Sequence, residues 1–192
     1  RDRRQPDAGA LGAVSLETAR PRAILSRMRL LFVGDVVGKS ARQALRRRLR
    51  ALRRERDVAF VVANGENAAG GKGLDPDSAD KLFDAGVDVI TTGNHVWQHS
   101  RLLPVLEHET RIIRPANFPE GNPGRGFTVQ RAANGVSVAV VNLIGRVFMG
   151  SFDCPFRAVD RILAQVAGEA DVVLVDMHAE TTSEKVAMGW HL

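Results

Sequence analysis

Apolar blocks alternate with amphipathic stretches along most of this chain. The apolar or β-branched blocks predict strands at 29–33, 58–63, 87–92 and 171–177. Between them, apolar residues recur at helical spacing, which predicts helices over 39–56, 75–86 and 156–170. Strands that alternate with helices are typical of an α/β fold with a mainly parallel sheet.

The middle of the chain has weaker patterns. A short helical stretch at 100–109 is interrupted by Pro104, and the segment 111–126 is rich in Pro and Gly, which indicates a loop with at most one strand. Asn134-Gly135 lies between two β-rich runs within 127–145, which predicts a hairpin that adds antiparallel strands.

Residues 1–27 mix Arg, Pro, Gly and Ala without sustained periodicity, and a strong strand begins directly after Met28. We expect a disordered N-terminal extension in front of one domain over 28–192. An Arg-rich leader, or a natural start at Met28, is also consistent with this pattern.

Composition narrows the class of protein. The 192 residues are 44% hydrophobic and 26% charged, which is typical of one soluble globular domain. No apolar run approaches the roughly 20 residues of a membrane helix. The single cysteine, Cys154, excludes an intramolecular disulfide and fits a reducing compartment, so we expect a cytoplasmic protein.

The formal charge of +5 is unevenly distributed. Residues 39–56 carry nine basic residues and one acidic residue, a net charge of 9 − 1 = +8. Ala41, Leu45, Leu49 and Leu52 form the apolar side of this predicted helix, so the arginines lie on its other faces. The basic face is either a solvated helix surface or a contact for a polyanion such as RNA.

The stretch "FVGDVVGKSA" at 32–41 resembles a phosphate-binding P-loop, but its spacing is wrong. A P-loop needs four residues between its first glycine and Gly-Lys-Ser, whereas three separate Gly34 from Gly38. Asp35 would also place a carboxylate in an anion cradle. A P-loop nucleotide-binding protein, with Lys39, Ser40 and a Walker-B-like Asp176, is therefore the weaker alternative.

Four predicted strands are each followed by side chains that can bind metal or transfer protons. These side chains are Asp35, Glu66, Asn67, Asn94, His95 and His178. The carboxyl ends of strands in an open α/β sheet share one edge, so we expect the six to converge. Carboxylate, amide and imidazole ligands without a cysteine cluster suit Mn, Fe or Zn in a hydrolytic site, where paired ions activate water and neutralise a phosphoryl group.

Four motifs occur in one order: "GDVVG", "NGENAAGGKG", "TTGNHVW" and "DMHAETTSEK". Together they closely resemble the YmdB-type branch of calcineurin-like metallophosphoesterases, described as 2',3'-cyclic-nucleotide 2'-phosphodiesterases. The resemblance covers residues 28–192. It implies an α/β/β/α sandwich with mixed sheets, and a hydrolase that uses two divalent ions, Fe or Mn or else Zn, on cyclic nucleotides or related phosphoesters.

The resemblance also implies a role for each residue. Asp35 would bind the first metal with Asn67 in its shell, and Glu66 would bridge both ions. The second metal would be bound by Asn94 and His178. His95 would be the catalytic histidine, which protonates the leaving oxygen or stabilises the transition state.

The C-terminus departs from the family pattern. That pattern continues to a Gly-Thr-His-x-His segment whose histidines complete both metal shells, whereas this chain ends at "VAMGWHL". We therefore expect a C-terminally truncated domain with an incomplete metal site, for which an inactive binding or regulatory remnant is an alternative. A sheet shortened in this way exposes an edge that favours a homo-oligomer.

Overall fold

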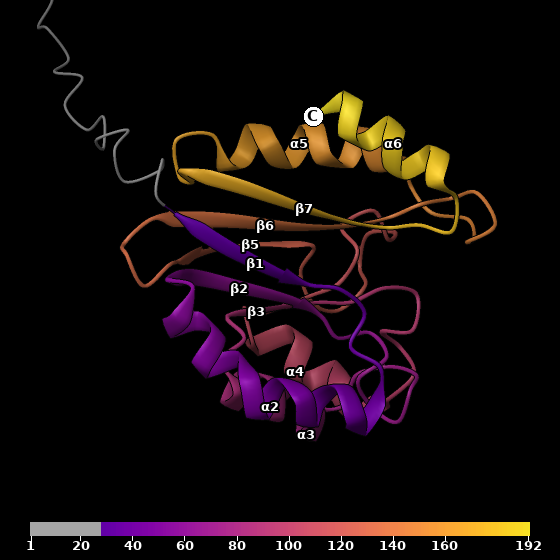
Figure 1. Cartoon of the computed structure of the whole chain (residues 1–192). Coiled ribbons are helices and arrows are strands. Elements are labelled where there is room, and N and C mark those ends of the chain that lie inside the picture. The colour runs from indigo at the N-terminus through magenta and orange to yellow at the C-terminus, as the bar shows by residue number, and fades with distance from the viewer. Residues whose placement is uncertain (1–27) are drawn as a thin grey trace, which may run out of the picture.

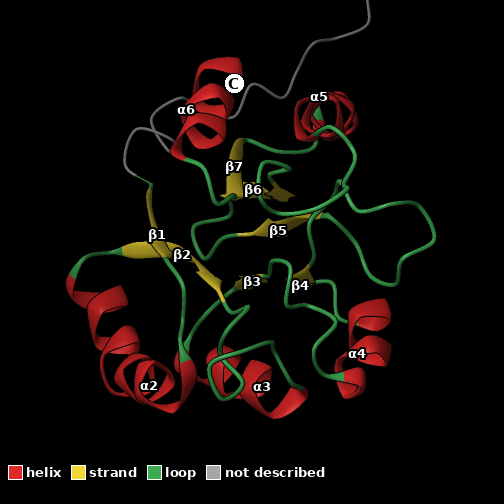
Figure 2. Ribbon diagram, turned by 90° about the vertical axis from the view of Figure 1, so that its right-hand side faces the viewer, coloured by secondary structure: helices red, strands yellow, loops and turns green. Residues whose placement is uncertain are grey.

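The computed structural model describes residues 28–192, which fold into two β-sheets packed face to face between two layers of helices (Figure 1). The predicted extension over 1–27 lies outside the described residues. Four layers in the order α/β/β/α are visible when the molecule is viewed along the strands (Figure 2).

The first sheet contains four parallel strands in the order β1-β2-β3-β4. Their bounds are β1 Arg29–Val33, β2 Val58–Asn64, β3 Val89–Thr91 and β4 Ile112–Ile113. β2 and β3 are buried on both faces, apart from the start of β2, which explains why their sequences are almost continuously apolar. Because the strands are parallel, all four end at the same edge of this sheet.

Four helical segments cover the outer face of the first sheet: α2 Gly38–Glu55, α3 Pro76–Ala85, the 3₁₀ turn η1 Ser100–Leu102 and α4 Leu103–His108. The sequence determines the ends of α3 closely, because the Asp75 side chain accepts a hydrogen bond from the Ser78 amide and Gly86 ends the helix with φ 108°. Pro104 lies in the first turn of α4, where proline is tolerated.

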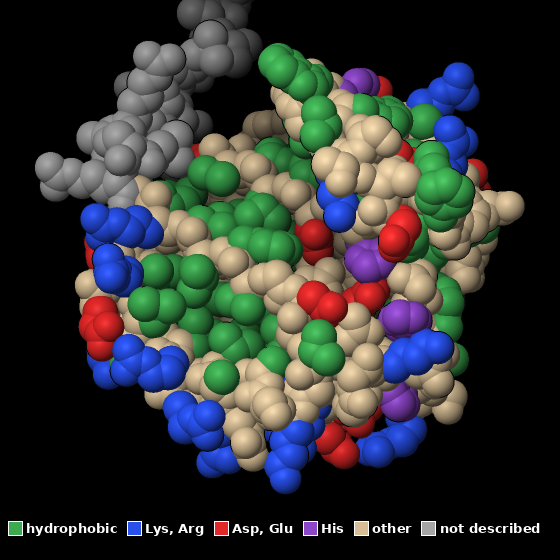
Figure 3. Space-filling model, turned by 45° about the vertical axis from the view of Figure 1, so that its right-hand side comes forward, with side chains coloured by type: hydrophobic (Ala, Val, Ile, Leu, Met, Phe, Trp, Pro, Cys, Tyr) green, Lys and Arg blue, Asp and Glu red, His purple; other side chains and the backbone are tan. Residues whose placement is uncertain are grey.

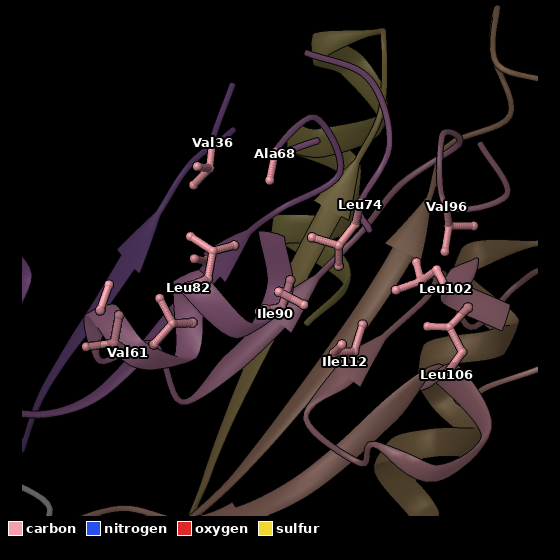
Figure 4. Close-up of a cluster of buried hydrophobic side chains, with 14 of the residues drawn as sticks. Val36, Val61, Ala68, Leu74, Leu82, Ile90, Val96, Leu102, Leu106 and Ile112 are labelled. Atoms are coloured by element: carbon pink, nitrogen blue, oxygen red, sulfur yellow. The ribbon is translucent and has the colours of Figure 1, made fainter. Parts of the chain in front are cut away.

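A first core joins these helices to the sheet (Figure 4). Leu82 of α3, Ile90 of β3 and Leu106 of α4 are all completely buried in it. Each fully buried aliphatic side chain of this size contributes roughly 1.5–3 kcal/mol. This core fixes α2 and α3 against the strands whose ends carry the predicted site.

The second sheet has the order β5-β6-β7, with β5 Phe127–Arg131, β6 Ser137–Ile144 and β7 Val172–His178. β6 pairs antiparallel with β5 and parallel with β7, so the predicted hairpin is confirmed. Helices α5 Pro155–Val166 and α6 Thr182–His191 lie on its outer face. The sequence predicted α5 but not α6.

A second core fills the space between the sheets. Phe60 and Val62 of β2 pack there with Val138 and Val140 of β6. The α/β/β/α sandwich with mixed sheets that the resemblance implied is therefore confirmed. The strand pattern by itself predicted one mainly parallel sheet, whereas His178 lies on a different sheet from Asp35, Glu66 and Asn94. Within residues 28–192, none of the helices combines the length and apolar character needed to cross a bilayer.

Candidate active site at the strand ends

The segment after β1 presents Asp35 at the carboxyl edge of the first sheet. Its neighbour Val36 is buried, and the Val36 amide donates to the Asn64 carbonyl at 2.9 Å. Two residues later, the Gly38 amide donates to the Asn67 carbonyl, also at 2.9 Å. These two backbone bonds attach the segment that follows Asp35 to the end of β2 and to the turn after it, while the Asp35 carboxylate stays exposed.

The turn after β2 buries a carboxylate. The Gly65 amide donates to the Thr91 carbonyl at 2.9 Å, and the Glu66 amide donates to Oδ1 of Asn64 at 3.2 Å. This turn leaves only 4% of Glu66 exposed. Burial raises the pKa of Glu66, and the nearby charges of Asp35 and Asp176 raise it further, while His178 and Asn67 lower it.

Two histidines flank the Glu66 carboxylate: His95 from the turn after β3 and His178 from the end of β7. Nδ1 of His95 lies 3.5 Å from Oε1, and Nε2 of His178 lies 3.4 Å from Oε2. Oε2 has no hydrogen-bond donor among residues 28–192, although it is fully buried. A buried carboxylate oxygen without a donor is costly, so this atom marks a position suited to a cation.

The side chain of Asn67 connects Asp35, Glu66 and His95. Its Nδ2 donates to both carboxylate oxygens of Asp35 at 3.0 Å and to Oε1 of Glu66 at 3.2 Å. Its Oδ1 lies 3.0 Å from Nδ1 of His95. The side-chain amide of Asn67 therefore contacts two carboxylates and the imidazole at once.

The turn after β3 completes the cluster. Nε2 of His178 lies 2.9 Å from Oδ1 of Asn94. Gly93, which precedes Asn94, has no room for a side chain, because a Cβ atom there would lie 1.7 Å from Oε2 of Glu66 and 2.9 Å from the His178 ring. The sequence "TTGNH" thus needs glycine where the turn passes closest to the buried carboxylate.

Hydrogen bonds between the two sheets hold the strand ends together. Oδ2 of Asp176 on β7 accepts from Thr91 Oγ1 at 2.5 Å and from Asn64 Nδ2 at 3.1 Å. Asn142 of β6 donates to the Thr92 carbonyl at 2.8 Å. These contacts bring the end of β7, and with it His178, beside the turns that carry Glu66 and Asn94.

The structure brings together all six residues predicted for the site: Asp35, Glu66, Asn67, Asn94, His95 and His178. We call this cluster the strand-end site. A cavity of about 240 Å³ lies beside it and is lined by residues that include Asp35, Asp176 and His178. Figure 3 shows acidic and histidine side chains gathered on this face of the molecule.

The donor set of the strand-end site fits a divalent cation in chemistry, but it is not assembled as a ligand shell. Within residues 28–192, no three His, Cys, Asp or Glu side chains are grouped as a set that could hold a metal ion. The amides of Asn67 and Asn94 lie between the charged groups and bond to them. The buried Oε2 of Glu66 and the absence of space for a side chain at Gly93 are the features that favour a bound cation.

The P-loop alternative is not favoured by the geometry. Lys39 lines a pocket on the outer surface of α2 and α3, whereas Asp176 lines the cavity beside the strand-end site. Asp176 is engaged instead by Thr91 and Asn64.

Sequence reasoning missed the supporting residues of the strand-end site. Asn64, Thr91 and Asp176 connect the strand ends, and Gly93 provides space for Glu66. A signal was present for three of them, because each is a polar residue in an otherwise mainly apolar strand, at the last position of β2 and of β3 and near the end of β7. The pairing of Asp176 with the other two depends on the face-to-face packing of the sheets, which the strand pattern did not indicate.

Comparisons with known proteins agree with the fold and with the four motifs. The family model described as YmdB-like protein matches residues 31–192. The chain is 43% identical over 164 residues to a Bacillus subtilis (strain 168) protein named 2',3'-cyclic-nucleotide 2'-phosphodiesterase. The aligned region covers 85% of this chain and 62% of that relative.

Two solved structures superpose well on the chain. A hypothetical protein from Thermus thermophilus has a TM-score of 0.80 and 45% identity, over 86% of this chain and 63% of that one. A novel phosphatase from Mycoplasma pneumoniae has a TM-score of 0.77 and 32% identity, over 85% of this chain and 59% of that one. The chain thus spans about three fifths of the length of these relatives.

Proposed function

Because this chain belongs to the YmdB-like protein family, we propose that it carries the site of a metal-dependent phosphodiesterase that acts on 2',3'-cyclic nucleotides or related phosphoesters. The observation that carries the proposal is the convergence of six predicted residues around the buried Glu66 carboxylate, where Oε2 has no donor among residues 28–192. The name of the B. subtilis relative supports the substrate class.

We propose that the site holds two divalent ions, Mn or Fe or else Zn. Asp35 and Asn67 would hold one ion, Asn94 and His178 the other, and Glu66 would lie between them. Such ions supply Lewis acidity and lower the pKa of water, so that a nucleophile is available near neutral pH. Asn67 would have to release Asp35, because its Nδ2 now donates to both oxygens of that carboxylate.

His95 is suited to deliver a proton. Its Nδ1 faces Oδ1 of Asn67 at 3.0 Å and Glu66 at 3.5 Å, which leaves Nε2 for the substrate. A histidine positioned in this way can give a proton to a leaving oxygen as a general acid.

The proposed reaction is a hydrolysis. Water adds to phosphorus and gives up one proton to solvent, the bond between phosphorus and the ribose 2'-oxygen breaks, and Nε2 of His95 gives its proton to that oxygen and regains one from solvent. The product is a nucleoside 3'-phosphate.

The test is Mn-dependent hydrolysis of 2',3'-cAMP and of bis-p-nitrophenyl phosphate. The 192-residue chain would be assayed beside the same chain extended through a Gly-Thr-His-x-His segment, with His95→Ala and Glu66→Ala variants of each. We expect turnover that requires both side chains. The proposal fails if neither chain binds metal or hydrolyses either ester.

Self-association is a further part of the proposal. β1 and β7 are edge strands, and Phe32 and Val173 on them are each 40% exposed. Exposed apolar strands at a sheet edge favour pairing with a second chain. A monodisperse monomer in sedimentation velocity would contradict this expectation.

A cytoplasmic location, expected from the single cysteine, also stays a prediction.

A further inference from the structure

The strand-end site does not account for the basic surface of α2. Lys39, Arg42, Gln43 and Arg46 of α2 line a pocket of about 300 Å³ together with Lys81 of α3. We call these five residues the basic pocket. Four of them are cations, and within residues 28–192 none of the four forms an ion pair with a carboxylate. A concave surface with four unpaired cations attracts an anion with several charges.

Other arginines of the same helix are engaged in holding the fold. Arg50 donates to the Asp84 carbonyl at 2.6 and 3.0 Å, and Arg53 donates to the Gly86 carbonyl and pairs with Asp88. These contacts tie α2 to the end of α3 and to the start of β3. Near the N-terminus of α2, Arg42 is bonded to the fold through the Ala68 carbonyl, whereas Lys39 and Arg46 have no hydrogen-bond or ion-pair partner within residues 28–192 and are available for a ligand.

The basic pocket adjoins the strand-end site. Lys39 follows Gly38, whose amide donates to the carbonyl of Asn67 at 2.9 Å. Arg42 donates to the carbonyl of Ala68, in the same loop. From Lys39 to Arg46 the helix rises about 10 Å away from the site. Figure 3 shows Lys and Arg side chains below and to the left of the acidic and histidine side chains.

We propose that the basic pocket binds the phosphate backbone of single-stranded RNA whose 3' end enters the strand-end site. The proposal rests on the proposed function. In RNA, a 2',3'-cyclic phosphate forms when a ribose 2'-hydroxyl attacks the neighbouring phosphodiester. The bond from phosphorus to the 5'-oxygen of the next nucleotide breaks, and that oxygen takes up the proton that the 2'-hydroxyl loses. The cyclic phosphate is therefore first formed at the 3' end of an RNA strand, and a cyclic mononucleotide arises only when that strand is degraded further. With the cyclic end in the strand-end site, the preceding phosphates of the strand would contact the row of cations beside the site.

An acidic protein is a weaker match than RNA. Asp77, Asp80 and Asp84 of α3 lie close to Lys81 in sequence and repel any anion, so binding depends on contacts with the individual cations of the pocket. Phosphates spaced along a flexible strand can reach individual cations in the pocket.

The test is fluorescence anisotropy with a labelled oligoribonucleotide of about 12 nucleotides that ends in a 2',3'-cyclic phosphate. Binding is measured in metal-free buffer, so that it does not depend on hydrolysis. With four phosphate contacts, the slope of log Kd against log salt is about 2.8 on single strands, and Kd rises about 50-fold between about 50 and 200 mM salt.

The decisive variant is Arg46→Ala/Lys81→Ala. We expect it to weaken binding and to lower the slope by about 1.4, because two contacts are lost at about 0.7 each. The matched control is Arg47→Ala/Arg48→Ala, which removes the same charge from exposed positions of α2 that do not line the pocket. This control should keep the wild-type slope.

Three outcomes would overturn the inference: equal slopes for both variants, no binding by the wild-type chain, or displacement of RNA by polyglutamate at equal charge concentration. The last result would identify a site for acidic polypeptides. Failure of the proposed function is distinguishable, because the chain would then bind RNA in this assay yet hydrolyse no phosphodiester with metal present.

Discussion

The carboxylates at the two ends of the first sheet differ in their partners. At the amino end, Asp88 precedes β3, accepts from the Val61 amide at 2.7 Å and pairs with Arg53 at 3.0 Å. At the carboxyl end, Glu66 is more deeply buried, lies near two other carboxylates and has an oxygen without a donor among residues 28–192.

Glu109 repeats the amino-end arrangement. It precedes β4 and forms two hydrogen bonds with the Arg111 guanidinium, at 2.6 and 2.9 Å. Acidic residues at the amino end are thus matched by cations of the protein. At the carboxyl end, no Lys or Arg within residues 28–192 pairs with Glu66 or Asp35, and Glu66 faces two histidines instead. This is the arrangement expected where the balancing cation is bound from solution.

The largest expected effect is that of Glu66→Gln, which removes the charge while keeping the size of the side chain. Metal-dependent hydrolysis should fall about 1,000-fold, a loss of about 4 kcal/mol in transition-state stabilisation. The metal-free variant should unfold at a higher temperature than the wild type, because a desolvated charge is removed. Steady-state kinetics and thermal unfolding measure the two effects. Glu109→Gln is the control and should leave hydrolysis unchanged.

At the opposite end, Asp88→Ala should damage stability and spare chemistry. The replacement leaves the Val61 amide and Arg53 without their acceptor, so we expect the free energy of unfolding to fall by about 2 kcal/mol. Urea titration gives this value. If hydrolysis per folded molecule fell as well, the two ends would not be functionally separate.

A smaller effect is expected for Asp176→Asn. Asp176 orients Asn64 and Thr91 beneath the Glu66 turn, so its replacement should weaken Mn²⁺ affinity about 10-fold. Calorimetric titration measures the change. Asp160→Asn, on the exposed side of α5, is the matched control. Equal affinities for the two variants would remove Asp176 from the support of the site.

The smallest effect concerns pH. The hydrogen bonds from Arg111 hold the pKa of Glu109 below its usual value of 4.5. A lowered pKa gives stability that is present above 4.5 and is lost as the pH falls through the folded-state pKa. Glu109→Gln should therefore be less stable than the wild type near pH 7, by less than about 1 kcal/mol, and the difference should shrink as the pH falls below 4.5. A difference that stays constant in urea titrations at pH values above and below 4.5 would contradict this.

The sequence predicted the strands, α2, α3 and the hairpin because each has a pattern that one element explains. β2 is apolar along most of its length, and α3 has both an N-cap aspartate and a terminal glycine. α6 escaped prediction because Met188 is its only buried residue within the described chain, while Val186 and Trp190 are exposed. A helix with so little apolar contact has no periodic signal.

The sequence predicted that the six residues of the strand-end site converge, because each lies at or just after the end of a strand. Their partners were not, because Asp176 meets Asn64 only through the packing of two sheets. Contacts across 112 positions of the chain depend on tertiary structure and leave no local pattern.

The central claim is that the carboxyl end of the first sheet binds divalent metal through Glu66. The most direct test is calorimetric titration of Mn²⁺ into the wild-type chain and into Glu66→Gln, with circular dichroism to verify that both are folded. We predict saturable binding by the wild type and none by the variant. Equal binding by the two folded proteins would contradict the claim.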